Sequence, residues 1–183
     1  MAKNNIKSKK GFTIIEVVLV LAIAGLIFLM VFIALPALQS SQRDTQRRED
    51  LARFSSQLNQ YSANNRGKIP STDEEWRSFV LEYLAKVTCN YGTEEAFNDC
   101  LRTAASNGQN RFVDPDGDAY TIKVRGSMEN NSSSQKAGSD FNHEINIWTY
   151  AQCDGESVVK STGARKVAIS FRLESAGTFC GTN

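Results

Sequence analysis

Three carboxylates at alternate positions form a group of potential metal ligands in this sequence of 183 residues. They are Asp114, Asp116 and Asp118, in the segment Asp-Pro-Asp-Gly-Asp-Ala-Tyr. Carboxylate oxygens with this spacing suit Ca²⁺, but the segment is not an EF-hand. Its glycine comes too early, and Arg125 stands where a bidentate glutamate is needed. Pro, Asp and Gly also favour a tight turn between strands, so a turn and a calcium site both remain open.

Residues for other chemistry are scarce. The chain has one histidine, His143, and four cysteines without a Cys-x-x-Cys pair. These counts argue against zinc fingers, iron–sulfur clusters and histidine-based catalytic sites. His143 lies in a polar segment without an identifiable partner, and no nucleophile elbow, phosphate loop or His-Glu-x-x-His motif is present. We therefore expect no enzymatic activity and no cofactor apart from the calcium considered above.

Glu16 stands at the edge of a long apolar segment. The 19 residues from Val17 to Leu35 contain no polar or charged side chain, close to the ~20 that span a bilayer as a helix. The four lysines before this segment predict a cytoplasmic N-terminus, and no small-x-small cleavage site follows it. A carboxylate at membrane depth costs roughly 2.5–3.5 kcal/mol and needs a partner. Lys9 and Lys10 lie near enough to serve as one.

The segment Lys-Gly-Phe-Thr-Ile-Ile-Glu, residues 10–16, resembles the processing motif of type IV pilins and their relatives. In that family a membrane peptidase cuts after the glycine, the new N-terminal phenylalanine is N-methylated, and the glutamate guides filament assembly. The resemblance implies a leader of residues 1–11, cleavage between Gly11 and Phe12, and N-methylation of Phe12. It gives Glu16 a partner in the terminal amine of a neighbouring subunit.

The resemblance also implies an α+β fold, in which a long N-terminal α-helix packs on an antiparallel β-sheet head. We expect a membrane-spanning or filament-core half at 12–38, an amphipathic half at 39–66 and a head at 67–183. Pro36 should kink or melt the helix, and family members lose helicity between a glycine, here Gly25, and a proline on assembly.

The amphipathic half has apolar residues at spacings of three and four, which predict a stripe that rests on the sheet. The charges at 43–50 mix signs, as on a solvated helix face or at contacts between subunits. The stripe consists of Leu51, Phe54, Leu58 and Tyr61.

The head should contain two further helices followed by strands. Ser71 and Glu74 have capping-box spacing at the start of the first helix. The connection from Ser127 to His143 is polar, could carry adhesion or glycans on a filament, and holds N-x-S triplets at Asn130 and Asn131. The expected helices are Ser71–Val87 and Thr93 to about Ala105, and the expected strands are Tyr120–Val124, Ile145–Thr149 and Val167–Leu173.

Four cysteines in an exported head predict two disulfides, for which three pairings are possible. We favour Cys89 with Cys100 and Cys153 with Cys180, because both pairs are local in the inferred layout. The second pair is similar to the C-terminal disulfide of many pilins.

The function implied is that of a type IV pilus subunit, which polymerises through its N-terminal helix into a surface filament for adhesion or twitching motility. Its partners would be copies of itself, the prepilin peptidase, the assembly platform and motor, the cytoplasmic membrane before assembly, and a host or neighbouring cell surface. Loss of the leader leaves 17 basic against 20 acidic residues, a net charge of −3, which argues against nucleic acid as a partner.

Three alternatives remain. A pseudopilin of a type II secretion system is favoured by the Asp-Pro-x-Gly-x-x-Tyr frame and disfavoured by the cysteines and the long polar connection. A competence pilin for DNA uptake is the second alternative. A single-pass anchored surface-binding protein that does not polymerise is disfavoured by the processing motif.

Overall fold

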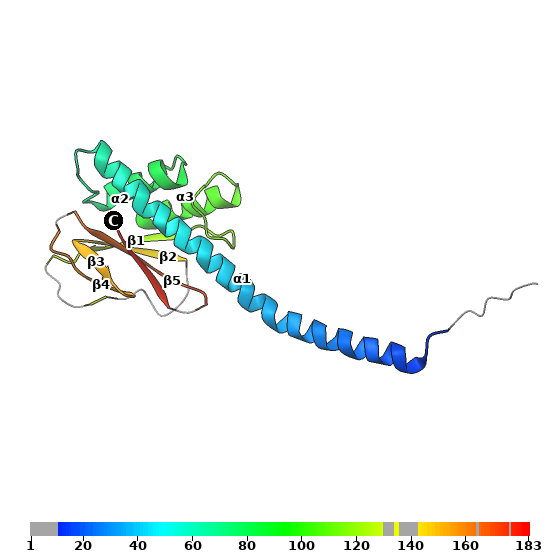
Figure 1. Ribbon diagram of the computed structural model, residues 1–183. Helices are drawn as coiled ribbons and strands as arrows, with labels where there is room; N and C mark the ends of the chain where they lie inside the picture. Colours follow the sequence, from blue (N-terminus) through cyan, green and yellow to red (C-terminus); the bar gives the residue numbers. More distant parts are fainter. Residues whose placement is uncertain (1–10, 130–133, 136–142, 164, 176) are drawn as a thin grey trace, which may run out of the picture. The chain divides into compact units, whose positions relative to one another are not determined.

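The computed structural model describes residues 11–129, 134–135, 143–163, 165–175 and 177–183 (Figure 1). The chain divides into two compact units, of which the first ends at Gln39 and the second is Ser40–Asn183. Asn130, Asn131 and most of the polar connection lie outside the described residues.

Helix α1, Ile14–Asn64, begins in the first unit and ends in the second. Its apolar part exposes large side chains all round, from Ile14 to Leu38. By length and composition, α1 is able to cross a membrane. Gly25 and Pro36 both lie within continuous helix, and the predicted loss of helicity between them on assembly stays a prediction.

Within the second unit, α1 supplies one wall of the main core. Leu51, Phe54 and Leu58 are fully buried, which confirms the predicted apolar stripe. Tyr61 is half-buried and packs edge-on against Phe79. The helix then stops at a left-handed turn, where the N–H of Gly67 donates to the carbonyl of Ser62 at 2.7 Å.

Two further helical segments follow, and they differ in detail from the prediction. Helix α2, Asp73–Phe79, continues into a π-helix, η1, Val80–Ala85, so the expected single α-helix changes its hydrogen-bond pattern. The capping box joins Thr72 to Glu75 rather than Ser71 to Glu74. The shift has a physical reason, because the Glu75 carboxylate accepts from the backbone N–H groups of both Ser71 and Thr72. Helix α3, Glu94–Ser106, begins after Thr93 as expected.

The main sheet has the strand order β1-β2-β5-β6. Strands β2, β5 and β6 pair antiparallel, whereas β1 and β2 pair parallel. The prediction of an antiparallel sheet therefore fails at this one pair, because the long connection between β1 and β2 permits the crossover that parallel strands need. A separate hairpin, β3–β4, was not predicted. The strands are β1 Thr121–Ser127, β2 Glu144–Thr149, β3 Ala151–Asp154, β4 Ser157–Lys160, β5 Val167–Arg172 and β6 Thr178–Thr182.

The sheet is covered on both faces. Alternate side chains of β2 and β5, such as Ile147 and Ile169, join the core with α1, α2 and η1. On the other face, Trp148 and Ala168 pack with Ala151 and Val158 of the β3–β4 hairpin. Figure 1 shows this hairpin beside the main strands.

Two disulfides close the structure, with the pairing favoured from the sequence. Cys89 bonds Cys100 and ties the segment after η1 to α3, with a Cα–Cα distance of 6.0 Å. Cys153 bonds Cys180 and joins β3 to β6, with a Cα–Cα distance of 5.7 Å. Both distances are ordinary for disulfides.

Candidate functional site

The predicted cleavage site lies on accessible, non-helical chain. Gly11, Phe12 and Thr13 precede α1, and the Phe12 side chain is 85% exposed. A Cβ added to Gly11 would meet no atom within 4 Å, so the packing of the described chain does not require glycine there. A requirement for glycine would therefore come from an enzyme that binds this segment.

Glu16 occupies the first turn of α1. The Thr13 carbonyl accepts from the N–H groups of Glu16 at 3.2 Å and Val17 at 3.3 Å, which starts the helix. The positive end of the helix dipole favours a carboxylate at this position. Among the described residues, Glu16 forms no salt bridge, and the side chains that follow it are exposed and apolar. The acid therefore has no charged partner within the described part of its own chain.

The N-terminal segment is also the part of the chain that matches a known family. The family model of the prokaryotic N-terminal methylation motif matches residues 6–32. The chain has the N-terminus of a type IV prepilin-like protein. No curated protein and no solved structure matches the chain.

The prepilin motif implies processing by a prepilin peptidase and assembly into pilus-like filaments. Together with the apolar part of α1, it fits a precursor anchored in the membrane. The motif belongs to structural pilin-type proteins rather than to an enzyme family. The motif therefore supports a type IV pilin-like or pseudopilin protein.

A second cluster of functional groups surrounds Arg47, in the second unit. Arg47 is fully buried, and its Nε and Nη2 donate to the two carboxylate oxygens of Asp114 at 2.7 Å each. Its Nη1 donates to Asp44 at 2.9 Å and to Glu174 at 3.0 Å. We call Arg47, Asp44, Asp114 and Glu174 the Arg47 network. The sequence left two alternatives for the charges at 43–50, a solvated helix face or contacts between subunits. Asp44 and Arg47 fit neither, because both side chains are buried within their own chain.

The aspartate segment forms the tight turn that its composition favoured. The N–H of Gly117 donates to the Asp114 carbonyl, and the N–H of Asp114 donates to the Asp118 carbonyl, both at 2.8 Å. Gly117 has a φ of 100°, which glycine adopts without strain. Asp114 is thus held in place to receive Arg47 from α1.

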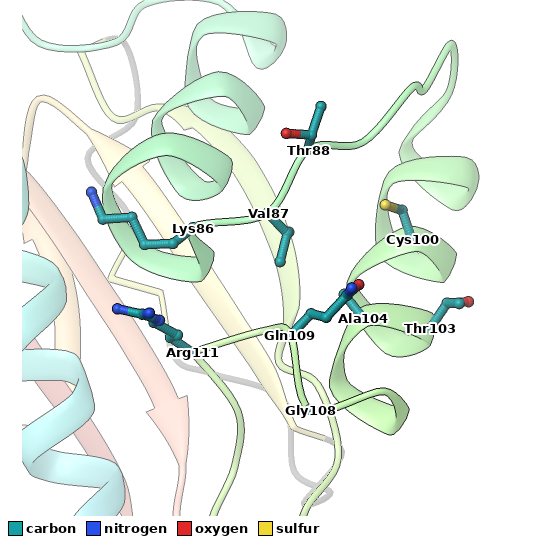
Figure 2. A pocket seen from close by; sticks show the side chains of 9 residues that line it. All are labelled: Lys86, Val87, Thr88, Cys100, Thr103, Ala104, Gly108, Gln109 and Arg111. Carbon is teal, nitrogen blue, oxygen red and sulfur yellow. The ribbon is translucent and has the colours of Figure 1, made fainter.

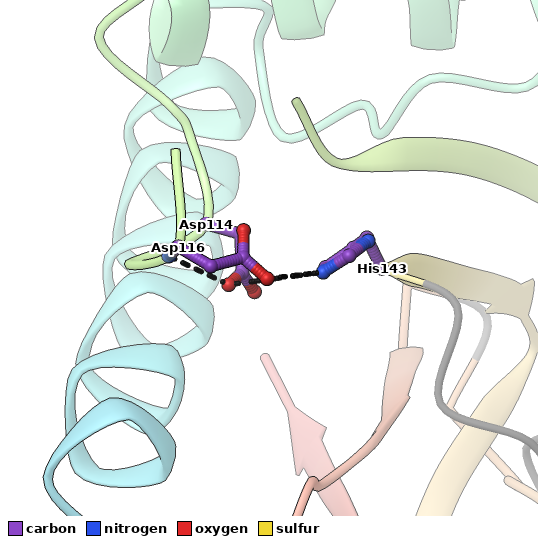
Figure 3. A group of neighbouring side chains, drawn as sticks. All are labelled: Asp114, Asp116 and His143. Carbon is purple, nitrogen blue, oxygen red and sulfur yellow. Dashed lines mark hydrogen bonds and ion pairs between the residues drawn. The ribbon is translucent and has the colours of Figure 1, made fainter. Parts of the chain in front are cut away.

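His143 has a partner that the sequence did not reveal. Its Nε2 lies 2.6 Å from Asp116 Oδ2, as the dashed line in Figure 3 shows. The Thr121 N–H donates to the His143 carbonyl at 2.9 Å, next to the start of β2. The parallel pairing of β1 with β2 therefore brings His143 to the aspartate turn.

Asp114, Asp116 and His143 lie close enough together to hold a metal ion, and Asp118 is not part of this group. One of these three ligands is an imidazole, and the Asp114 carboxylate is already bound at both oxygens by Arg47. Calcium prefers oxygen ligands. Calcium bound by Asp114, Asp116 and Asp118 stays a prediction, and the contacts of Asp114 favour an electrostatic role for this residue.

Hydrogen bonds within the network change the acidity of its carboxyl groups. Hydrogen bonds from Arg43 and Arg47 lower the pKa of Glu174 to about 2. Burial acts to raise the pKa of Asp44, but hydrogen bonds from Ser175, from the Glu174 backbone and from Arg47 lower it overall. Both carboxylates are therefore held in their charged form.

We expect the second unit to lose stability as the pH falls from about 4.5 towards 2. The pKa of Glu174 is 4.5 before the shift and about 2 in the folded chain, so the unfolded chain takes up this proton first. The stability that the charged Glu174 carboxylate contributes is fully present above the pKa of the unfolded chain, and it is lost as the pH falls through the pKa of the folded chain. Thermal unfolding of the full chain in detergent, followed by circular dichroism, measures it. Glu174→Gln should show a shallower loss over this range, and equal slopes would contradict the assignment.

Proposed function

We propose that this protein is a structural subunit of a type IV pilus, exported through the cytoplasmic membrane and polymerised into a surface filament for adhesion or twitching motility. The observation that carries the proposal is a methylation motif joined to an apolar helix with a single acid in its first turn. The two disulfides suit a protein that works outside the cytoplasm. In this role the protein has no catalytic activity of its own.

Assembly rests on a charge pair between subunits. Cleavage after Gly11 creates an α-amino group at Phe12, with an ordinary pKa of about 7.7–8.0. Glu16 of one subunit pairs with this cation on its neighbour, inside a filament core of apolar helices. Charge attraction is stronger in such a low-dielectric environment than in water. The pair therefore fixes the axial position of each subunit as well as drawing it in.

The pseudopilin alternative rests on the aspartate segment. Its Asp-Pro-x-Gly-x-x-Tyr frame is similar to one in secretion pseudopilins, and here the frame positions Asp114 for Arg47. The two functions differ in where the polymer is found. A pseudopilus stays within the cell envelope, whereas a pilus extends from the cell surface.

The deciding experiment is electron microscopy of filaments sheared from cells, with mass spectrometry of the purified subunit. A pilus subunit should be abundant in surface filaments as a chain that begins with N-methyl-Phe12. Finding the subunit only in the membrane and envelope fractions at native expression would favour the pseudopilin or the non-polymerising anchored protein.

We expect Gly11→Val to block processing. The chain itself has room for a side chain at this position, so the substitution should leave the fold intact and act through the peptidase. The precursor should accumulate in the membrane with its leader attached, and filaments should be absent. Intact-mass measurement of the membrane fraction tests this. A mature-length Gly11→Val chain would contradict the assigned cleavage site.

A further inference from the structure

Two hollows in the second unit are lined by cations, and they differ in how many of those cations are already paired. The first, of about 710 Å³, lies between the segment after η1 and the end of α3 (Figure 2). Its charged lining residues are Lys86 and Arg111, which extend away from Cys100 in Figure 2. Lys86 Nζ lies 5.5 Å from the ring centroid of Tyr83, so this cation already has a partner in its own chain. The first hollow therefore offers little to an anionic ligand.

The second hollow, of about 430 Å³, lies at the turn that ends α1. Its volume falls within the ~300–1,000 Å³ of sites that hold small molecules. Arg66 and Lys68 line it, one on each side of Gly67 in the sequence. Apart from Ile69, the other lining residues are polar, namely Tyr61, Asn64, Asn65, Ser71 and Glu75. A polar ligand with an acidic group suits such a lining.

Arg165 brings a third cation to this turn from the segment before β5. A Cβ built on Gly67 would lie 2.8 Å from Arg165 Nη1 and 3.2 Å from its Cζ, so the guanidinium occupies the space that a side chain would take. Gly67 has a φ of 79°, a conformation that glycine adopts without strain. Glycine at this position therefore permits both the turn and the approach of Arg165. We call Arg66, Lys68 and Arg165 the basic turn.

The basic turn carries more positive charge than its surroundings balance. Among the described residues, none of its three cations forms a salt bridge or a side-chain hydrogen bond, and all three are exposed. Glu75 is the acid that lines the hollow, and its carboxylate accepts from the Ser71 N–H at 2.6 Å and from the Ser71 hydroxyl at 2.8 Å. Hydrogen bonds from Ser71 first, and attraction by Lys68 last, lower the pKa of Glu75. Three cations against this one acid leave a surplus of positive charge.

Acidic surroundings limit the size of an anion that the basic turn is able to hold. The neighbouring groove is lined by Glu74 and Glu82, which do not line the hollow at Gly67. Without its leader the whole chain has a net charge of −3 (17 − 20). Nucleic acid is usually bound by an extended basic surface that follows several phosphates. Three clustered cations beside acids suit a few acidic groups on a flexible polymer instead.

The uncharged groups of the hollow match the hydroxyl groups of a sugar. Asn64 and Asn65 each donate one amide hydrogen within the chain, to the Tyr83 hydroxyl at 3.3 Å and to the Tyr61 carbonyl at 2.9 Å. Their side-chain oxygens accept no hydrogen bond from the described residues. An amide has two hydrogens and an acceptor oxygen, so both asparagines retain capacity for hydroxyl groups that donate and accept.

We infer that the basic turn binds an acidic polysaccharide, with its cations on sulfate or carboxylate groups and the adjoining hollow around a sugar residue. The inference rests on the proposed function and deepens it, because it names the class of surface polymer to which the filament adheres. The two guanidinium groups provide the stronger contacts, since each is able to donate to both oxygens of one acidic group.

Retention of the full mature chain on immobilised heparin, in a non-ionic detergent, tests the inference. The wild-type chain should bind, and a chain with Arg66→Gln, Lys68→Gln and Arg165→Gln should bind about tenfold or more weakly. The affinity of this variant should also depend less steeply on salt, because a linear polyanion releases fewer counterions when it meets fewer cations. Uncharged dextran should not compete with heparin.

Three exposed arginines away from the basic turn provide a control with the same loss of charge. Replacing Arg48, Arg102 and Arg111 together by Gln should leave the affinity for heparin nearly unchanged. A chain with Arg66→Lys and Arg165→Lys keeps the charge, so its affinity should lie between those of the wild type and the Gln variant. Circular dichroism and intact disulfides show that each variant has folded.

Four results would overturn the inference. The wild-type chain would fail to bind heparin at low salt, or the control variant would lose as much affinity as the basic-turn variant. Equal competition by inorganic sulfate and by a heparin tetrasaccharide, at the same sulfate concentration, would show a site that does not recognise sugar. Tighter binding of duplex DNA than of heparin would assign the basic turn to nucleic acid.

Failure of the proposed function would look different. In that case cells would form no filaments that contain this chain, whereas retention of the purified chain on heparin would still be measured in the same way. Filaments that assemble normally from a chain that does not bind heparin would overturn this inference alone.

Discussion

Glu16→Gln should abolish filament assembly while leaving processing intact. Glutamine keeps the shape and a hydrogen-bond acceptor but loses the charge, so it separates charge pairing from packing. Removing one member of a buried ion pair typically costs 3–5 kcal/mol, and here it would strand the terminal amine of a neighbouring Phe12. We expect Glu16→Gln and Glu16→Val to be cleaved and to stay in the membrane, yet to yield few or no filaments as the sole copy.

Intact mass shows whether the variant is cleaved, and electron microscopy shows whether it forms filaments. A cleaved variant without filaments has its defect in assembly. Wild-type subunit expressed beside Glu16→Gln should partly restore filaments, because the mutant's own N-terminus can still meet a neighbour's Glu16. A normal filament yield from Glu16→Gln alone would defeat the charge-pairing mechanism, though not the family assignment. In that case the carboxyl group would be protonated inside the filament.

Arg47→Met should destabilise the second unit more than any substitution of an exposed charge. Arg47 and the Asp114 side chain are both 0% exposed, so the substitution leaves Asp114 charged, buried and without its cation. Breaking a buried pair in this way costs about 3–5 kcal/mol, against a total folding stability of roughly 5–15 kcal/mol for an ordinary domain. Urea unfolding of the full chain in detergent, followed by circular dichroism, measures the loss.

Arg43→Met is the matched control for Arg47→Met. Arg43 lies one helical turn earlier and also pairs with Glu174, but the two side chains are 33% and 31% exposed. Such an exposed pair contributes about 0–1 kcal/mol. Adding Asp114→Asn to Arg47→Met should recover part of the loss, because it removes the stranded charge. Equal destabilisation by Arg43→Met and Arg47→Met would contradict the role of burial.

The N-terminal methylation motif and the helix stripe could be predicted because each depends on local sequence. The cleavage motif joins a glycine, a phenylalanine and an acid over six residues, 11–16. The stripe of Leu51, Phe54 and Leu58 follows the helical period, and these residues are buried as that period requires.

The Arg47 network could not be predicted from residue types alone, because charged residues usually lie on the surface. Asp44 and Arg47 continue the spacing of three and four that leads to Leu51, so the period itself placed them on the buried face. A buried charge is stable only when it has partners of opposite charge. The partners of Arg47 include Asp114 and Glu174, which are distant from it in the sequence. The helical spacing alone could have predicted that Asp44 and Arg47 are buried, but the identity of their partners depends on the tertiary fold.

The remaining differences concern features that residue spacing does not show. The parallel pairing of β1 with β2 depends on the path of a long connection, which strand alternation does not record. Strand β6 is short, contains Gly181 and is mostly half-buried, so it shows no clear alternation. The π-helical turn of η1 has the same apolar spacing as an ordinary helix end, and the sequence gives no sign of it.

In the proposed role, the two disulfides indicate the side of the membrane on which the second unit folds. A thiol pair in the reducing cytoplasm stays open, so Cys89–Cys100 and Cys153–Cys180 close only after translocation. The lysines before Phe12, by contrast, keep the cleavage site on the cytoplasmic side. In the proposed role, maturation of the N-terminus and oxidative folding therefore take place on opposite sides of the membrane. An uncut precursor can already carry both cross-links, so its thiol content reports topology independently of peptidase action.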